Sequence, residues 1–115
     1  MTGYAHGHHA EKVAARWLQH QGYKVYALNW RSPRAEIDII AQQPGGPLQF
    51  IEVKYRQSTG QGTGLEYITP TKQRQMRFAA ELWVAQHRYE GEYVLSGLEV
   101  SGVDYRVSAF IESIS

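Results

Sequence analysis

The chain has 115 residues, of which 43% are hydrophobic and 20% charged, so it can bury a core and is not a disordered segment. The absence of cysteine excludes disulfides, thiolate metal sites and cysteine catalysis. No apolar run approaches the roughly 20 residues that span a bilayer, and residues 1–12 lack the apolar core of a signal peptide. We expect a single domain over residues 1–115 that is soluble, cytoplasmic and without membrane contact.

Charge is unevenly distributed, although the formal net charge is only +1. Residues 1–77 hold ten Lys and Arg against five Asp and Glu, whereas residues 78–115 hold two against six. An excess of cations in the first part fits a surface that faces a polyanion, although a short chain also shows such an imbalance by chance.

Seven elements are predicted along the chain. Apolar residues at helical spacing predict a helix over 8–21 and a second helix over 69–87, where Pro70 fits the first turn. Aromatic and β-branched residues predict five strands, over 23–30, 35–41, 48–55, 92–100 and 105–112. The segment 57–66 is a glycine-rich loop. The order α-β-β-β-α-β-β has too few helices for a doubly wound sheet, so we expect an α/β or α+β fold with one mixed sheet flanked by helices.

Charged residues interrupt the apolar pattern of the predicted elements. Because side chains alternate along a strand, Glu36 and Asp38 share one face of the second strand. Glu52 and Lys54 likewise continue the apolar face of the third strand, and Glu11 lies at the margin of the apolar side of the first helix. Burying such charges costs free energy unless they pair with one another or bind a metal. Three aromatic residues, Trp17, Phe78 and Trp83, are expected in the core instead.

This set of charges suits metal-assisted phosphodiester hydrolysis. Because Mg²⁺ prefers carboxylate, carbonyl and water oxygens, we expect Asp38, Glu52 and the Val53 carbonyl to hold Mg²⁺ or Mn²⁺. Lys54 is expected to orient or deprotonate the attacking water and to stabilise the developing charge. Glu11 is expected to hold a water of the metal or a second ion.

Other charges are less specific. Glu36 is a spare carboxylate, as suited to supporting a ligand as to being one. A cross-strand ion pair between Asp38 and Lys54 is the alternative explanation of the strand charges. Cations near the predicted site are expected to contact phosphates, namely Arg31, Arg34, Arg56, Lys72, Arg74 and Arg77.

Three motifs within residues 7–84 form a specific combination. They are Gly7-His-His-Ala-Glu11, Glu36-Ile-Asp38-Ile-Ile-Ala41 and Phe50-Ile-Glu-Val-Lys-Tyr-Arg56. Together they resemble the bacterial YraN-like family, which is grouped with the restriction-endonuclease-like nucleases, the PD-(D/E)XK superfamily. The order Glu, Asp, Glu-x-Lys is also similar to that of archaeal Holliday-junction resolvases.

The resemblance implies an α-β-β-β-α-β core and a divalent-metal site at Asp38, Glu52 and Lys54, with Glu11 on the first helix. It implies an endonuclease that acts on DNA, including branched or unusual structures, and cutting both strands would favour a homodimer. The chain departs from the family at Ala10, where Gly is usual, and at 92–100, which lacks the usual Arg-Phe-Asp-Val pattern. The alternatives are a non-catalytic nucleic-acid-binding domain and a protein-interaction domain that retains the nuclease fold.

Overall fold

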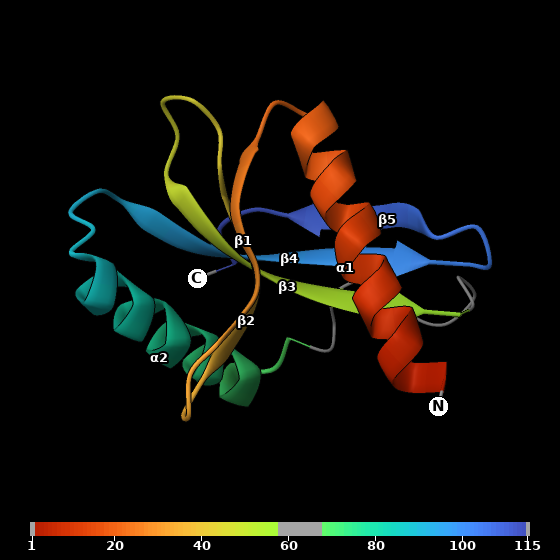
Figure 1. Cartoon of the computed structure of the whole chain (residues 1–115), viewed down its shortest axis with the longest axis horizontal. Helices are drawn as coiled ribbons and strands as arrows, with labels where there is room; N and C mark the ends of the chain where they lie inside the picture. Colours follow the sequence, from red (N-terminus) through yellow and green to blue (C-terminus); the bar gives the residue numbers. More distant parts are fainter. Residues whose placement is uncertain (1, 58–67, 115) are drawn as a thin grey trace.

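Two helices and five strands make up the fold, in the predicted order (Figure 1). The helices are α1 (Thr2–His20) and α2 (Pro70–His87), and the strands are β1 (Lys24–Arg31), β2 (Glu36–Gln42), β3 (Leu48–Arg56), β4 (Tyr93–Ser101) and β5 (Arg106–Ile111). The computed structural model describes residues 2–57 and 68–114, with side chains from residue 7 onward, so nearly all of the predicted glycine-rich loop lies outside the described residues. Neither described helix is long and apolar enough to cross a membrane.

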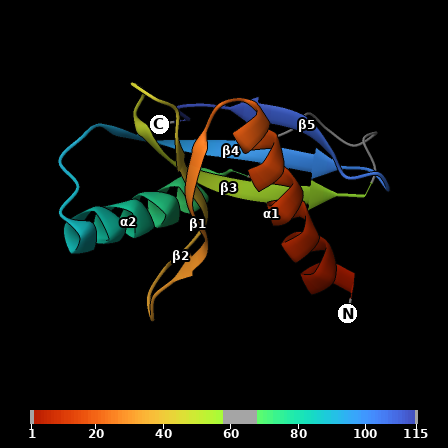
Figure 2. The same ribbon diagram turned by 45° about the horizontal axis from the view of Figure 1, so that its top comes forward.

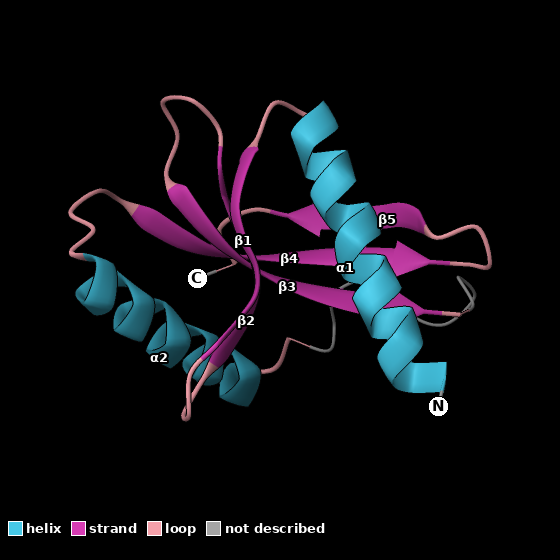
Figure 3. Ribbon diagram, in the orientation of Figure 1, coloured by secondary structure: helices cyan, strands magenta, loops and turns pink. Residues whose placement is uncertain are grey.

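The strands form a single mixed sheet in the order β1-β2-β3-β4-β5 (Figure 3). The pairs β1–β2, β2–β3 and β4–β5 are antiparallel, whereas β3 and β4 are parallel and run side by side from Leu48 and Tyr93 to Arg56 and Ser101. A parallel pair needs a crossover connection, which α2 provides. The predicted α+β class with one mixed sheet is confirmed.

A separate hydrophobic core lies on each face of the sheet. On the face covered by α1, the buried residues include Ala10, Ala14, Leu18, Ile39, Ala41, Ile51, Leu98 and Val100. On the face covered by α2, they include Ile37, Ile40, Leu48, Phe50, Met76, Ala79, Ala80 and Leu95. Trp17 and Trp83 pack against these cores as predicted. Phe78 does not: it is 44% exposed, because it lies about 200° around α2 from Met76, so its predicted place in the core was wrong.

Local signals set the helix ends. The Thr69 side chain accepts a hydrogen bond from the Lys72 amide at 3.2 Å, and Pro70 occupies the first turn, which fixes the start of α2 at the predicted position. Gly22 follows α1 with a φ of 95°, a conformation that favours glycine. α1 begins at Thr2, six residues before the predicted start at residue 8.

A hydrogen-bond network joins three buried side chains, Tyr23, Gln49 and Ser96, to the exposed Glu112. Ser96 Oγ donates to Gln49 Oε1 at 2.7 Å, and Gln49 Nε2 donates to the Tyr23 hydroxyl at 3.1 Å and to Glu112 Oε1 at 2.8 Å. Tyr23 also donates to Glu112 Oε1, at 2.8 Å. The network satisfies the buried Gln49 amide and links β3 and β4 to Tyr23, just before β1, and to the segment after β5.

The strands β2 and β3 separate part-way along their length. Their pairing extends only from Gln42–Leu48 to Ile39–Ile51, whereas β1 and β2 stay paired as far as Arg31–Glu36. The β1–β2 ribbon therefore turns away from the rest of the sheet (Figure 2).

The alternation of side chains also breaks at this point. Ile37 packs in the α2-side core, whereas Ile39 packs in the α1-side core, so the strict alternation expected along β2 was wrong. Asn29 lies between Leu28 and Trp30, the partners of Ile39 and Ile37, and has a φ of 56°. Asn tolerates this left-handed conformation better than most residues, and it bends β1 opposite the separation of β2 from β3.

Candidate functional site

Asp38 lies where β2 leaves β3. Its Oδ2 accepts a hydrogen bond from the Val53 amide of β3 at 2.8 Å, just beyond the last paired residues, Ile39 and Ile51. The carboxylate thus replaces the backbone carbonyl that a continuing strand would have supplied. The amide and carbonyl of one strand residue point to the same edge, so the Val53 carbonyl faces this gap as well.

Glu11 reaches the gap from α1. It follows the fully buried Ala10, which packs α1 onto the sheet, and its carboxyl group shares a hydrogen bond with that of Asp38. Two neighbouring carboxyl groups repel each other when both are charged, which favours the protonated form of one of them. The sequence signal that Glu11 interrupts the apolar side of α1 therefore reflects its position beside Asp38.

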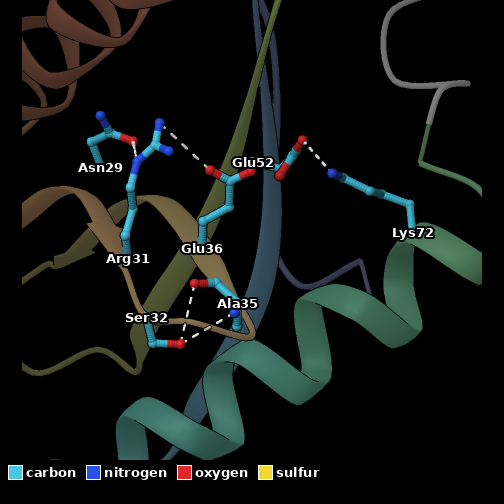
Figure 4. Close-up of polar contacts among 7 residues, drawn as sticks. All are labelled: Asn29, Arg31, Ser32, Ala35, Glu36, Glu52 and Lys72. Atoms are coloured by element: carbon cyan, nitrogen blue, oxygen red, sulfur yellow. Dashed lines mark hydrogen bonds and ion pairs between the residues drawn. The ribbon is translucent and has the colours of Figure 1, made fainter.

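Glu52 enters the site from the α2 side of β3. Its Oε2 lies 3.0 Å from Nζ of Lys72, in the first turn of α2 (Figure 4). Lys72 is positioned by the Thr69 cap, because Thr69 fixes where α2 begins. The site is therefore assembled from both layers, with α1 supplying a carboxyl group and α2 supplying an ammonium group.

The carboxyl groups have raised pKa values. Burial raises the pKa of Asp38 from 3.8 to about 7, the Val53 hydrogen bond offsets part of that rise, and the charge of Glu11 adds to it. Burial also raises the pKa of Glu52 from 4.5 to about 6, with repulsion from Asp38 adding to it and Lys72 opposing it. Burial raises the pKa of Glu11, while its hydrogen bond to Asp38 opposes the rise. A cation bound among these carboxylates would offset both the cost of burying their charge and their mutual repulsion.

A groove of about 630 Å³ opens beside Glu52, between the tip of the β1–β2 ribbon and the first turns of α2. Four cations line it: Arg31, Arg34, Lys72 and Arg74. The ribbon tip is a tight turn in which the Ser32 amide donates to the Ala35 carbonyl at 2.8 Å and the Ser32 hydroxyl accepts from the Ala35 amide at 3.2 Å. This turn fixes the backbone that carries Arg31 and Arg34.

Three other cations expected at the site do not line the groove. Arg56 Nε is 2.6 Å from Oε2 of Glu99, a residue of β4 that is only 6% exposed. Arg77 is exposed on α2 and is not part of the groove lining, and Lys54 is exposed on β3 beyond Glu52, also outside the lining.

Glu36, the spare carboxylate, is exposed at the groove and lies 3.7 Å from Arg31 (Figure 4). The structure therefore brings together Glu11, Asp38, Glu52 and Lys72 and places three of the predicted phosphate-binding arginines at the groove.

Comparison with known proteins identifies the family. Residues 10–104, which include all of these carboxylates, match the family described as Uncharacterised protein family UPF0102. The chain belongs to UPF0102. This confirms the YraN-like resemblance inferred from the motifs.

Several UPF0102 proteins show how far the similarity extends. One from Thermosynechococcus vestitus is 44% identical over 79 residues, 68% of this chain and 64% of that protein. One from Rhodococcus opacus is 43% identical over 80 residues, 70% of this chain and 67% of that protein. One from Chlorobaculum parvum is 47% identical over 79 residues, 69% of this chain and 60% of that protein. The match thus spans 60–67% of the length of these relatives.

The donor set of this UPF0102 chain fits Mg²⁺ or Mn²⁺ in chemical type. Among the described residues, no three His, Cys, Asp or Glu side chains form a ready-made ligand cluster. Mg²⁺ does not require one, because it keeps several waters and is usually bound by one or two carboxylates together with substrate phosphates. Asp38, Glu52 and the Val53 carbonyl would hold the ion.

Some groove residues were missed from the sequence. Phe78 lines the groove and was assigned to the core, although the seam formed by Met76, Ala79 and Ala80 already leaves it on the other side of α2. Ser32 was assigned only to a turn, and its role in fixing the ribbon tip depends on hydrogen bonds that no periodic pattern reveals.

Proposed function

We propose that this UPF0102 chain is a Mg²⁺- or Mn²⁺-dependent endonuclease that hydrolyses phosphodiester bonds in DNA. The observation that carries the proposal is the pair of strand carboxylates, Asp38 and Glu52, with pKa values raised to about 7 and about 6. Glu52 lines a groove whose lining also includes four cations. Perturbed carboxylates next to a cationic groove are typical of sites that do chemistry on a phosphate.

The groove cations bind the substrate in this proposal. Arg31, Arg34 and Arg74 contact phosphates on either side of the cleaved bond, since guanidinium groups match phosphate geometry with two parallel hydrogen bonds. These contacts place one phosphate beside Asp38 and Glu52. When bound, the metal ion supplies Lewis-acid polarisation of that phosphate.

The two lysines near Glu52 have different roles. Lys54, two residues beyond Glu52 on β3, orients the attacking water and stabilises the negative charge that develops as the water attacks. Lys72 stands 3.0 Å from Glu52 and donates to the phosphate oxygens as negative charge develops on them. Glu11 supports Asp38 through the hydrogen bond that their carboxyl groups share.

The substrate class extends to DNA with unpaired or branched segments. Phe78 is 44% exposed at the groove, where it offers an apolar surface to a base that is not stacked in a duplex. A regular duplex presents only its backbone and groove edges and would leave this side chain without a partner.

A non-catalytic nucleic-acid-binding domain is the second candidate. The observation that favours it is the ion pair itself, because Lys72 already offsets the charge of Glu52. In that case the groove binds DNA and the carboxylates serve only to position the cations.

Metal binding and cleavage, measured together, separate the two candidates. Mg²⁺ and Mn²⁺ are titrated by calorimetry into the wild-type chain, Asp38→Asn and the control Asp104→Asn, which removes an exposed carboxylate. Cleavage of linear, nicked and four-way-junction DNA is assayed in the same buffers. The endonuclease predicts metal-dependent cleavage that Asp38→Asn abolishes and Asp104→Asn retains. Binding of DNA without metal binding or cleavage would support the second candidate.

A further inference from the structure

A second groove lies between α1 and β1. Its volume is about 380 Å³, and it is lined by Lys12, Ala15, Arg16 and Gln19 of α1 and by Val25, Tyr26, Ala27 and Leu28 of β1. Figure 2 shows α1 beside β1, which is the edge strand of the sheet. The residues that line this second groove are distinct from those that line the groove beside Glu52.

The charged side chains of the second groove are all positive. Lys12 and Arg16 are exposed and lie one turn apart on α1, so both head groups face the same side. Lys24 adds a third cation at the start of β1, with its ammonium 5.1 Å from the centre of the Tyr26 ring. Among the described residues lining the groove, none is acidic. Its complement is therefore a polyanion.

Apolar side chains stand exposed among these cations. Tyr26 is 49% exposed and Leu28 is 44% exposed, although Val25, Ala27, Asn29 and Trp30 of the same strand are half-buried. Cations that track a backbone, combined with an exposed aromatic ring, are the features that bind single-stranded nucleic acid without sequence preference. A duplex would satisfy the cations but would leave Tyr26 and Leu28 in water.

The second groove begins next to the candidate active site. Lys12 directly follows Glu11, and Leu28 directly precedes Asn29, where β1 bends opposite the gap between β2 and β3. We propose that the second groove binds a single strand of nucleic acid that leaves the candidate active site, an inference that rests on the proposed function for the origin of that strand. It assigns Lys12 and Arg16 to phosphates and Tyr26 to a base.

The test is binding of a fluorescent single-stranded oligothymidine to the full chain, measured by anisotropy in EDTA at several salt concentrations. Three proteins are compared with the wild type: Lys12→Gln with Arg16→Gln, Tyr26→Ser alone, and a control that removes two exposed cations elsewhere, Arg88→Asn with Arg106→Gln. Asn suits the left-handed backbone at position 88. Thermal unfolding verifies that each variant is folded.

The expected results differ between the variants. Loss of two phosphate contacts lowers the slope of log affinity against log salt by about 1.4, at about 0.7 for each single-strand contact. Tyr26→Ser weakens binding about fivefold or more without changing that slope, because stacking is not ionic. In the control, the change in affinity should be smaller than that in either groove variant, and the change in slope should be smaller than that in Lys12→Gln with Arg16→Gln.

Several results would overturn the inference. They are absence of single-strand binding, or losses in the control equal to those in the groove variants. The outcome is independent of cleavage. If the wild type cleaves DNA but the groove variants bind oligothymidine as the wild type does, the role of the second groove is refuted and the proposed endonuclease activity stands. If the groove variants lose oligothymidine binding but the wild type never cleaves DNA, the endonuclease activity is refuted and single-strand binding by the second groove stands.

Discussion

Replacing Asp38 by Asn should stabilise the folded chain at pH 8. Asn keeps an oxygen that accepts the Val53 amide hydrogen bond and removes the buried charge. The difference between 3.8 and about 7 in the Asp38 pKa corresponds to about 4 kcal/mol of preference for the neutral acid, at about 1.4 kcal/mol per tenfold change. Because Glu11 and Glu52 share this repulsion and water reaches part of the site, we expect a gain of ~1–3 kcal/mol in the free energy of unfolding.

The gain should depend on pH in a defined direction. The folded-state pKa of Asp38 lies above its unfolded value, so the folded chain binds more protons between pH 4 and 7. The wild type therefore has the full contribution of this group below about pH 4 and loses it as the pH rises through about 7. The advantage of Asp38→Asn should be small near pH 4 and complete by pH 8.

Urea unfolding in EDTA from pH 4 to pH 8 measures this difference. Asp104→Asn, at an exposed ion pair with Arg106, is the matched control and should show no such trend. If Asp38→Asn were instead less stable than the wild type at pH 8, the carboxylate would be a structural group. The inference that burying the charged Asp38 lowers the stability of the folded chain would then be refuted.

Three further predictions concern the site and its support. Lys72→Met should raise the pKa of Glu52 above about 6, because Lys72 lowers it in the folded chain; a carboxyl NMR titration measures this, and an unchanged value would contradict the ion pair. Mg²⁺ or Mn²⁺ affinity should fall as the pH is lowered from 8 to 6, since the raised pKa values require binding to release protons; calorimetry in buffers of different ionisation enthalpy counts those protons, and a count of zero would argue against carboxylate ligands. Gln49→Leu should cost ~1–3 kcal/mol of stability by leaving Ser96 and Tyr23 without this partner, while metal affinity stays unchanged; urea unfolding and calorimetry test both parts.

The element order followed from local signals that the structure preserves. Thr69 and Pro70 mark the start of α2, and the five strands lie within one residue or two of the predicted ranges, because runs of aromatic and β-branched residues end at glycine and proline turns. The start of α1 was missed because residues 2–7 (Thr-Gly-Tyr-Ala-His-Gly) include two glycines and show no apolar period. Local composition alone does not reveal that such a segment continues a helix.

Features of the site that depend on distant contacts could not be read from the sequence. Asp38 and Glu52 were expected on neighbouring strands, but no local pattern in the sequence indicated that β2 separates from β3 between them, opposite the left-handed Asn29. The ion pair joins Glu52 of β3 to Lys72, which lies 20 positions later in the first turn of the crossover helix α2. Arg56 was expected to contact phosphate, and its position beside the buried Glu99 follows from the parallel pairing of β3 with β4.

The hydrogen bond from Val53 to Asp38 makes one backbone amide a natural spectroscopic probe. An amide proton that points at a carboxylate resonates at a different frequency when that carboxylate takes up a proton or turns to a cation, because its acceptor loses negative charge. The Val53 resonance should therefore follow the titration of Asp38 and the filling of the site in the unmodified chain. A single peak in an ¹⁵N spectrum then reports the state of the site at every pH and metal concentration, without an introduced label or an assumed substrate.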